Sequence, residues 1–434
     1  MDKEQFVHRL ERITNLQDTV AEVLDVLPVK LPGGTKQKLM DWILQDEKID
    51  EMLSGIKKRR PPRFILLGRT GAGKSSLINA MMGSYLAETS DVLTGTWAAE
   101  KYRYHDNSGE VVLEVIDTRG FGSLKEENPV SARKELAEVF RKFAPDAVLF
   151  MVRAKERSYL NRDLSLLQEM GDLFPEGIPV LALASQVDEL EPSRYKDPSA
   201  YPSRKKENIS QVINRLEEIM PDCLPVLEVM PVSSYIEWVK ADGSAVDPGD
   251  LTAEEARELK IHFDGRFGIE KLTELLENNM DLRARIQFMM SSKMDHLIDD
   301  LCDLFINRFS VIAGAVGTTP VPTSDMFILT PLQIVMITLI AYLSGREISF
   351  SSSREFLLTA GGTGLVGKIF QQGAKLLNLV VPGTGSAVSG SIAASGTYAI
   401  GKAAKHYYLR DVSEEKLSEI IKQAREKYQA DRGE

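Results

Sequence analysis

Apolar residues near the start of the chain recur at helical spacing. Steps close to three, four and seven residues predict one helix stripe ended by Pro28, through Phe6, Leu10, Ile13, Val20, Leu24 and Leu27. A second helix is predicted after an LPGG turn, through Leu39, Trp42, Ile43, Ile49, Met52, Leu53 and Ile56. We therefore expect an N-terminal helical hairpin over residues 1–62.

From residue 63 the pattern changes to short apolar runs that alternate with helical stretches. The runs are FILLG, VVLEVID, AVLFMV, PVLALAS and PVLEVMPVSS. Such runs predict an α/β fold over residues 63–280, in which a mostly parallel sheet is covered on both faces. Residues 235–266 are expected to form an insertion or long loop, and residues 267–280 the helix that closes the sheet.

After residue 281 the pattern is helical and unusually apolar. Met326 to Ser344 is a stretch of nineteen residues without a charge, and Phe356 to Leu409 contains no Asp or Glu. This predicts a C-terminal helical domain over residues 281–434. Nineteen residues is marginal for a transmembrane helix, and the small-residue spacing that follows suits helix contacts in lipid and in a packed bundle alike. A buried core and membrane attachment therefore both stay open.

The segment GRTGAGKSS, residues 68–76, directly follows the first apolar run and fits the pattern G-x-x-x-x-G-K-[ST]. A triphosphate presents several negative oxygens, which backbone N–H groups near the glycines and the start of the next helix can meet. We expect Lys74 to reach the outer phosphates and the Ser75 hydroxyl to bind Mg2+. The predicted phosphate-binding residues are Gly68, Thr70, Gly71, Ala72, Gly73, Lys74, Ser75 and Ser76.

The second apolar run ends in the D-x-x-G sequence that begins at Asp117. Asp117 is expected to hold Mg2+, and the N–H of Gly120 to sense the γ-phosphate. One threonine between the two motifs should bind Mg2+ in the triphosphate state. Thr94 and Thr96 both qualify, and Thr96 is favoured because it stands just before the next strand. The assigned catalytic residues are Lys74, Thr96 and Gly120, and the assigned metal ligands are Ser75, Thr96 and Asp117.

Recognition of guanine requires a carboxylate that accepts hydrogen bonds from N1–H and from the exocyclic amine, a donor pair that adenine lacks. The usual sequence is [NT]-K-x-D after an apolar strand, and here PVLALAS is followed by Gln186, Val187 and Asp188. Asp188 is in place, whereas Gln186 replaces the lysine that normally covers the base, which predicts weakened affinity. One run later, Ser233 and Ser234 occupy the loop that contacts the base carbonyl.

Composition places limits on partners and compartment. The chain of 434 residues is 43% hydrophobic and 27% charged, as in folded proteins of two or three domains. A net charge of -10 argues against a nucleic-acid partner, because such binding depends on Lys and Arg. The start, MDKEQFVHRLERI, lacks a secretory signal, which predicts a cytoplasmic protein. Association with the inner face of a membrane is the open alternative.

These motifs, in this order, resemble the translation-factor-like GTPases, and among them the Era-like and septin-like groups. The phrase RPPRFILLGRTGAGKSSLINAMMG is similar to the bacterial YfjP and YeeP type of GTPase. Helices on both sides of the G domain resemble the immunity-related GTPases. The apolar C-terminal region is similar to the bacterial 697 domain of unknown function, whose members are often membrane-associated.

The resemblance implies a GTPase that hydrolyses GTP to GDP and phosphate with Mg2+. Many G domains have a glutamine after D-x-x-G, but here the residue is Phe121, which has no hydrogen-bonding group. Intrinsic hydrolysis is therefore expected to be slow unless self-assembly or a protein partner completes the site. The alternative is a soluble regulatory switch that binds a protein partner and hydrolyses little GTP.

Overall fold

The structure is a computed structural model in which the chain divides into two compact units. We call residues 59–293 the sheet unit, and residues 1–58 with 294–434 the helical unit. The described residues are 3–25, 34–69, 71–92, 99–106, 109–118, 134, 137–138, 140–155, 177–220, 226–246, 251, 255–256, 258–292, 294–318, 324–348, 385–410 and 412–431.

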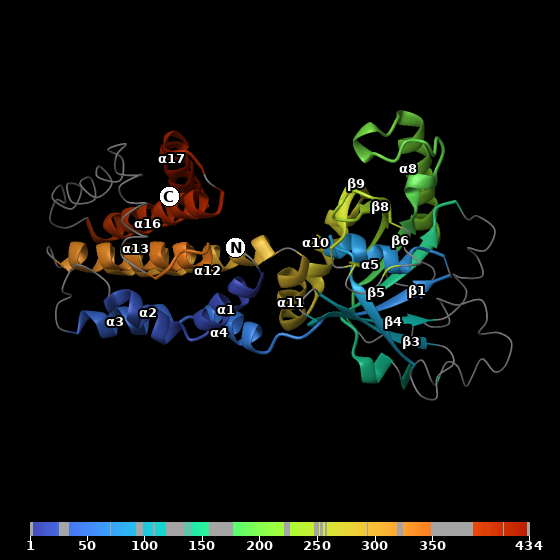
Figure 1. Cartoon of the computed structure of the whole chain (residues 1–434). Helices are drawn as coiled ribbons and strands as arrows, with labels where there is room; N and C mark the ends of the chain where they lie inside the picture. Colours follow the sequence, from blue (N-terminus) through green and yellow to red (C-terminus); the bar gives the residue numbers. More distant parts are fainter. Residues whose placement is uncertain are drawn as a thin grey trace. The chain divides into compact units, whose positions relative to one another are not determined.

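The sheet unit is built on seven strands in the order β2-β3-β4-β1-β5-β6-β7 (Figure 1). Strands β4, β1, β5, β6 and β7 are parallel, whereas β2, β3 and β4 pair antiparallel. The prediction of a mostly parallel sheet is therefore confirmed, although the apolar runs did not predict β2 and β3. The bounds are β1 Arg63–Gly68, β2 Ala87–Val92, β3 Ala99–His105, β4 Val111–Thr118, β5 Ala147–Arg153, β6 Val180–Ser185 and β7 Glu228–Pro231.

Alternate side chains of β1 enter different cores, because successive residues of a strand point to opposite faces. Phe64 and Leu66 pack with α5 (Lys74–Met82), α10 (Ile269–Asn279) and α11 (Leu282–Ser292). Ile65 and Leu67 belong to the opposite core, which includes residues of α8 (Ser203–Ile219). Burial on both faces explains why this strand is an unbroken apolar run in the sequence.

A two-stranded antiparallel ribbon, β8 (Ser233–Val239) with β9 (Lys260–Phe267), follows β7. The sequence pattern predicted an insertion or long loop across most of this region, because its apolar and polar residues alternate too irregularly to form an apolar run. The ribbon is paired by backbone hydrogen bonds and by the edge-to-face contact of Tyr235 with Phe263. Its first residue, Ser233, is fully buried.

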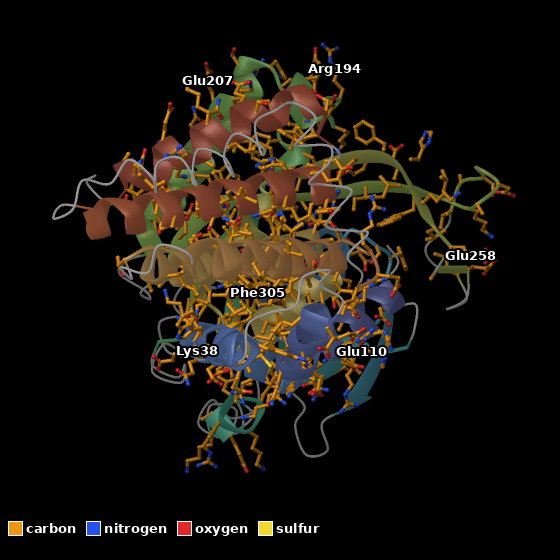
Figure 2. All side chains as sticks on the ribbon, turned by 90° about the vertical axis from the view of Figure 1, so that its left-hand side faces the viewer. Lys38, Glu110, Arg194, Glu207, Glu258 and Phe305 are labelled. Atoms are coloured by element: carbon orange, nitrogen blue, oxygen red, sulfur yellow. The ribbon has the colours of Figure 1, made fainter. Side chains whose placement is uncertain are left out.

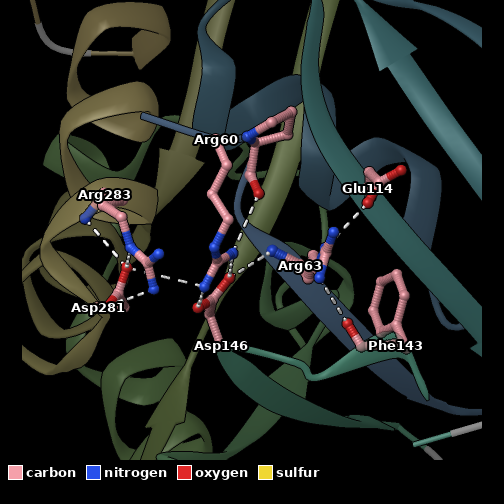
Figure 3. Close-up of polar contacts among 8 residues, drawn as sticks. Arg60, Arg63, Glu114, Phe143, Asp146, Asp281 and Arg283 are labelled. Atoms are coloured by element: carbon pink, nitrogen blue, oxygen red, sulfur yellow. Dashed lines mark hydrogen bonds and ion pairs between the residues drawn. The ribbon is translucent and has the colours of Figure 1, made fainter. Parts of the chain in front are cut away.

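A charged cluster joins the beginning of β1 to the beginning of β5 (Figure 3). Asp146 accepts hydrogen bonds from Arg60 Nη1 and Nη2 at 2.7 and 2.6 Å, and from the backbone N–H of Arg63 at 2.9 Å. The side chain of Arg63 pairs with Glu114 at 3.0 Å, and Asp281 lies 3.8 Å from Arg60. This cluster fixes the segment that leads into the first strand.

The N-terminal part of the helical unit contains four short helices in place of the two that the apolar spacing predicted. They are α1 (Lys3–Ile13), α2 (Leu16–Asp25), α3 (Thr35–Leu44) and α4 (Glu47–Lys57). The break before α4 has a local cause, because the Asp46 carboxylate accepts a hydrogen bond from the N–H of Ile49 at 3.1 Å and caps a new helix. The spacing of apolar residues continues across such a break, so it does not reveal it.

The C-terminal part of the helical unit contains α12 (Met294–Gly317), α13 (Ser324–Leu343), α16 (Gly385–Arg410) and α17 (Glu414–Ala430). Phe305 of α12 is fully buried among the side chains of this unit (Figure 2). The N-terminal helices contact α12 and α13, so the two ends of the chain share one unit. The sequence analysis had treated them as separate regions.

The apolar stretch over α13 is covered by protein. Residues from Leu332 to Leu343 are buried, with α12 and α16 among the neighbouring helices. Within this core, Gln333 donates a hydrogen bond to Thr397 at 2.9 Å. Among the described residues, no helix combines the length and the apolar character needed to cross a membrane.

A buried lysine joins α16 to α12 within the helical unit. Lys405 is 3% exposed and pairs with Asp299 at 2.5 Å and with Asp303 at 2.8 Å. Burial alone would raise the pKa of Asp303, but hydrogen bonds from Lys402 and Lys405 hold that pKa below its usual value. The pairing accounts for two of the C-terminal lysines that lack nearby acids in the sequence.

Candidate nucleotide-binding site

The phosphate-binding loop lies between the end of β1 and the start of α5. Gly71 and Gly73 adopt φ values of +80° and +86°, a left-handed conformation that side chains disfavour. Gly73 stands at the cap of α5, where backbone N–H groups of the first turn have no partner within the helix. Ala72 is buried, whereas Ser75 and Ser76 are exposed on that turn. Such a loop can meet phosphate oxygens with backbone donors.

Lys74 brings the loop together with the end of β4. Its ammonium donates to the carbonyls of Gly68 at 2.9 Å and Arg69 at 3.3 Å. The same nitrogen lies 3.3 Å from Oδ1 of Asp117, which β4 places beside β1 through the pairing of Leu66 with Asp117. A cation and a carboxylate therefore meet at the mouth of the loop, at the carboxyl ends of parallel strands, where ligands bind in open α/β sheets.

The donor set at this mouth fits Mg2+. Ser75 and Asp117 carry hard oxygen atoms of the kind that Mg2+ prefers, and Mg2+ is commonly held by one or two carboxylates together with substrate phosphates and water. Among the described residues, no group of three His, Cys, Asp or Glu side chains could hold a metal by itself.

Asp188 lies in a short 3-10 helix, Val187–Glu189, that follows β6. Its side chain is held from two sides, since Oδ1 accepts from the Ser233 hydroxyl at 2.9 Å and Oδ2 accepts from Lys196 at 2.7 Å. Asp188 is only 5% exposed. A carboxylate has about four lone-pair positions, so each oxygen keeps capacity for one further donor. Two parallel acceptors are what guanine requires.

Lys205 of α8 supports the same loop through its backbone carbonyls. Its side chain is fully buried, and its ammonium donates to the carbonyls of Asp188 at 2.6 Å and Tyr195 at 2.8 Å. Burial lowers the pKa of Lys205, and the nearby Asp188 carboxylate opposes that shift. Burial, together with Asp188 and Asp197, also raises the pKa of Tyr201 to about 12. The two hydrogen bonds from Lys205 hold the backbone around Asp188 in one position.

Gln186 and Ser185 connect the base-binding loop to its neighbours. Gln186 Nε2 donates to the Gly71 carbonyl at 2.8 Å, and Arg153 Nε donates to Gln186 Oε1 at 2.9 Å. The Ser185 hydroxyl donates to the carbonyl of Val152 at 3.3 Å, which ties β6 to β5. The predicted phosphate and base residues therefore lie on connected loops.

Several predicted site residues lie outside the described part of the chain, and one lies in the two-stranded ribbon. Thr70, Thr94, Thr96, Gly120 and Phe121 lie outside the described residues, so the catalytic and metal roles assigned to Thr96 and Gly120 stay predictions. Ser234 lies in β8, where it pairs with Arg266 of β9.

The sequence analysis missed three residues that contact the predicted site: Arg153, Lys196 and Lys205. Arg153 could have been found, because it follows an apolar run at the carboxyl end of a strand, where the other motifs also lie. Lys196 and Lys205 reach Asp188 across a loop, and no motif in the sequence marks them.

The fold and the arranged loops define a G domain of the P-loop GTPase class. Residues 63–184 match the family described as 50S ribosome-binding GTPase. That match covers the strands from β1 to β6, and it includes both the phosphate-binding loop and Asp117.

Two bacterial proteins of Escherichia coli (strain K12) are similar in sequence. "Uncharacterized protein YfjP" is 29% identical over 219 residues, which is 50% of this chain and 69% of YfjP. "Uncharacterized protein YkfA" is 29% identical over 202 residues, which is 46% of this chain and 64% of YkfA. The chain thus spans about two thirds of the length of these relatives.

Among solved structures, Toc33 from Arabidopsis thaliana is 14% identical, and the alignment covers 61% of this chain and 94% of that chain. The TM-score of that alignment is 0.29.

Proposed function

We propose that this chain binds GTP with Mg2+ and hydrolyses it to GDP and phosphate. The observation that carries the proposal is that the carboxyl ends of neighbouring strands present two groups of residues, one suited to phosphate and one suited to a base. Lys74 with Asp117 lies at the phosphate-binding loop, and Asp188, nearly buried with two partners, offers paired acceptors for a base. The first group suits a polyphosphate with a metal, and the second selects guanine over adenine.

In this reading the chain positions and stabilises, since phosphoryl transfer is catalysed mainly by positioning and electrostatics. Backbone N–H groups from Gly71 to Ser76 bind the phosphates, and Lys74 stabilises charge on the outer phosphates. Mg2+, held by Ser75, Asp117 and a threonine that we assign to Thr96, supplies further charge neutralisation when bound. Gly120 is assigned to the γ-phosphate by its backbone N–H.

We further propose that hydrolysis is slow until a second copy or a protein partner completes the site. The sequence supports this, because Phe121 cannot orient an attacking water. The nucleotide state would then change how the helical unit meets another molecule or a membrane surface. A second candidate is a switch that binds a protein partner and hydrolyses little GTP. Burial of the apolar residues of α13 favours this candidate over membrane contact, because residues that protein already covers are not available to lipid.

Calorimetry of the purified chain with GTP, GDP and ATP tests the core of the proposal. We expect uptake of GTP and GDP with Mg2+ and no comparable uptake of ATP, and Lys74→Ala is expected to weaken GTP binding. Folded protein that takes up no guanine nucleotide, or takes up ATP equally, would refute it. Liposome flotation with GDP and with a non-hydrolysable GTP analogue separates the membrane proposal from the partner-switch candidate.

A further inference from the structure

Gln186 stands where the base-recognition motif has a lysine, and its side chain lies across the phosphate-binding loop. Its amide nitrogen donates to the Gly71 carbonyl, and it would lie 3.5 Å from a Cβ added at Gly73. The backbone of Gln186 is left-handed, with a φ of +57°, which non-glycine residues seldom adopt. A conformation of this kind persists where surrounding contacts hold it.

Arg153, the last residue of β5, supplies such a contact. Its Nε donates to Gln186 Oε1 at 2.9 Å, and its Nη1 would lie 4.0 Å from a Cβ added at Gly71. The guanidinium carries a positive charge. The positive charge that Gln186 lacks is therefore present beside the same loop, on a neighbouring strand.

We propose that Arg153 is a positioning residue for nucleotide binding, and that Arg153 and Gln186 together replace the single lysine of the usual motif. This inference rests on the proposed function. A carboxamide has one acceptor end and one donor end. Because Arg153 occupies the acceptor end, the donor end must face the carbonyl of Gly71. Without Arg153 the amide is free to turn, and its oxygen would then repel that carbonyl.

The consequence is a division of two tasks that one lysine otherwise performs. Gln186 provides the reach to the phosphate-binding loop, and its stem provides cover for the base. Arg153 provides the positive charge and fixes the orientation of the amide. The contact also links the loop that binds phosphate to the loop that carries Asp188, so its loss should speed the release of nucleotide without altering the chemical step.

A double-mutant cycle tests this with Arg153→Met, Gln186→Lys and the combined variant. Arg153→Met should bind GDP about tenfold more weakly, because it loses a hydrogen bond from a charged donor. Gln186→Lys should weaken GDP binding similarly, because it places two cations together and removes the acceptor. In the combined variant the lysine acts alone, so GDP affinity should return to within about threefold of the original chain.

The measurements are the equilibrium affinity and the dissociation rate of a fluorescent GDP, with kcat for GTP alongside. Arg153→Lys should retain most of the affinity, because lysine can also donate to Gln186 Oε1. Arg215→Met, which changes an exposed arginine on α8, serves as the matched control. Thermal unfolding of each variant verifies that the sheet unit stays folded.

The outcomes separate this inference from the function on which it rests. If the original chain binds no guanine nucleotide, the proposed function fails and this inference fails with it. If the original chain binds GDP but the two substitutions weaken binding about a hundredfold together, their effects simply multiply, and only the pairing of Arg153 with Gln186 is refuted. Recovery in the combined variant supports it.

Discussion

Asp188→Asn should change which base the chain accepts. Asparagine offers one acceptor and one donor, whereas guanine presents two donors, N1–H and the exocyclic amine. Xanthine presents N1–H and a carbonyl oxygen, so it matches asparagine. The substitution should therefore weaken GDP and strengthen XDP.

The size of the effect follows from the surroundings of Asp188. Hydrogen bonds to charged groups contribute about 1.5–3 kcal/mol each, and at 5% exposure water cannot replace a lost partner. The substitution removes one such bond and places the asparagine NH2 opposite an N–H donor of guanine. Together these effects should cost about 3–5 kcal/mol, which is roughly 10² to 10⁴ in affinity. The pair with Lys196 is also lost, but that lysine side chain is 31% exposed, so the cost in folding stability should stay near 1 kcal/mol.

Equilibrium titration with fluorescent GDP and XDP measures the switch, and Glu189→Gln, one residue along the same short helix, is the control. We expect the control to bind GDP as the original chain does. If Asp188→Asn binds GDP as tightly as the original chain, Asp188 does not contact the base. If both nucleotides are lost, thermal unfolding will distinguish a misfolded loop from an error in the chemistry.

Three further predictions concern other parts of the chain. Lys74→Ala should weaken GTP binding by about 10²-fold or more, because a charge-assisted contact to phosphate is lost, and calorimetry with GTP checks this. Asp146→Ala should lower the free energy of unfolding of the sheet unit by about 2–4 kcal/mol, measured by urea denaturation, because it removes two hydrogen bonds from Arg60 and the acceptor of the Arg63 backbone N–H. The pKa of Asp303 is lowered by Lys402 and Lys405 against the effect of burial, so its stabilisation should be complete above about pH 4 and lost as the pH falls through its lowered pKa. Asp303→Asn should therefore reduce the slope of stability against pH below about pH 4, and cost about 1–2 kcal/mol at pH 7 because Asp299 still pairs with Lys405; an unchanged acid-unfolding curve would contradict this.

The α/β class and the position of the phosphate-binding loop could be predicted from the sequence because their signals are local. A strand buried on both faces is apolar through most of its length, and β1, β5 and β6 contain such runs, as does β4 apart from Glu114 and Asp117. The loop after β1 uses residues within one short segment, so its pattern appears in the sequence directly. Lys74 and Asp117 were each predicted to act at the nucleotide, and the structure places them 3.3 Å apart because β1 and β4 are adjacent parallel strands.

Other features depended on contacts between residues far apart in the chain. The apolar spacing predicted two N-terminal helices, and the structure has four, because a cap such as Asp46 can begin a new helix without disturbing the spacing. The β8–β9 ribbon escaped prediction because backbone pairing between partly exposed strands requires no continuous apolar run. The weak affinity expected from Gln186 likewise did not take Arg153 into account, whose contact with it spans 33 positions.

The sequence by itself determined the class of fold and the residues of the phosphate-binding loop, and it marked Asp188 as the candidate carboxylate for a base, since each signal depends on neighbouring residues or on strand periodicity. Only the tertiary structure decided that both ends of the chain form one helical unit and that the residues of α13 from Leu332 to Leu343 are buried there. It also decided which side chains surround Asp188. Such facts depend on long-range packing, because an apolar stretch looks the same in sequence whether protein or lipid covers it.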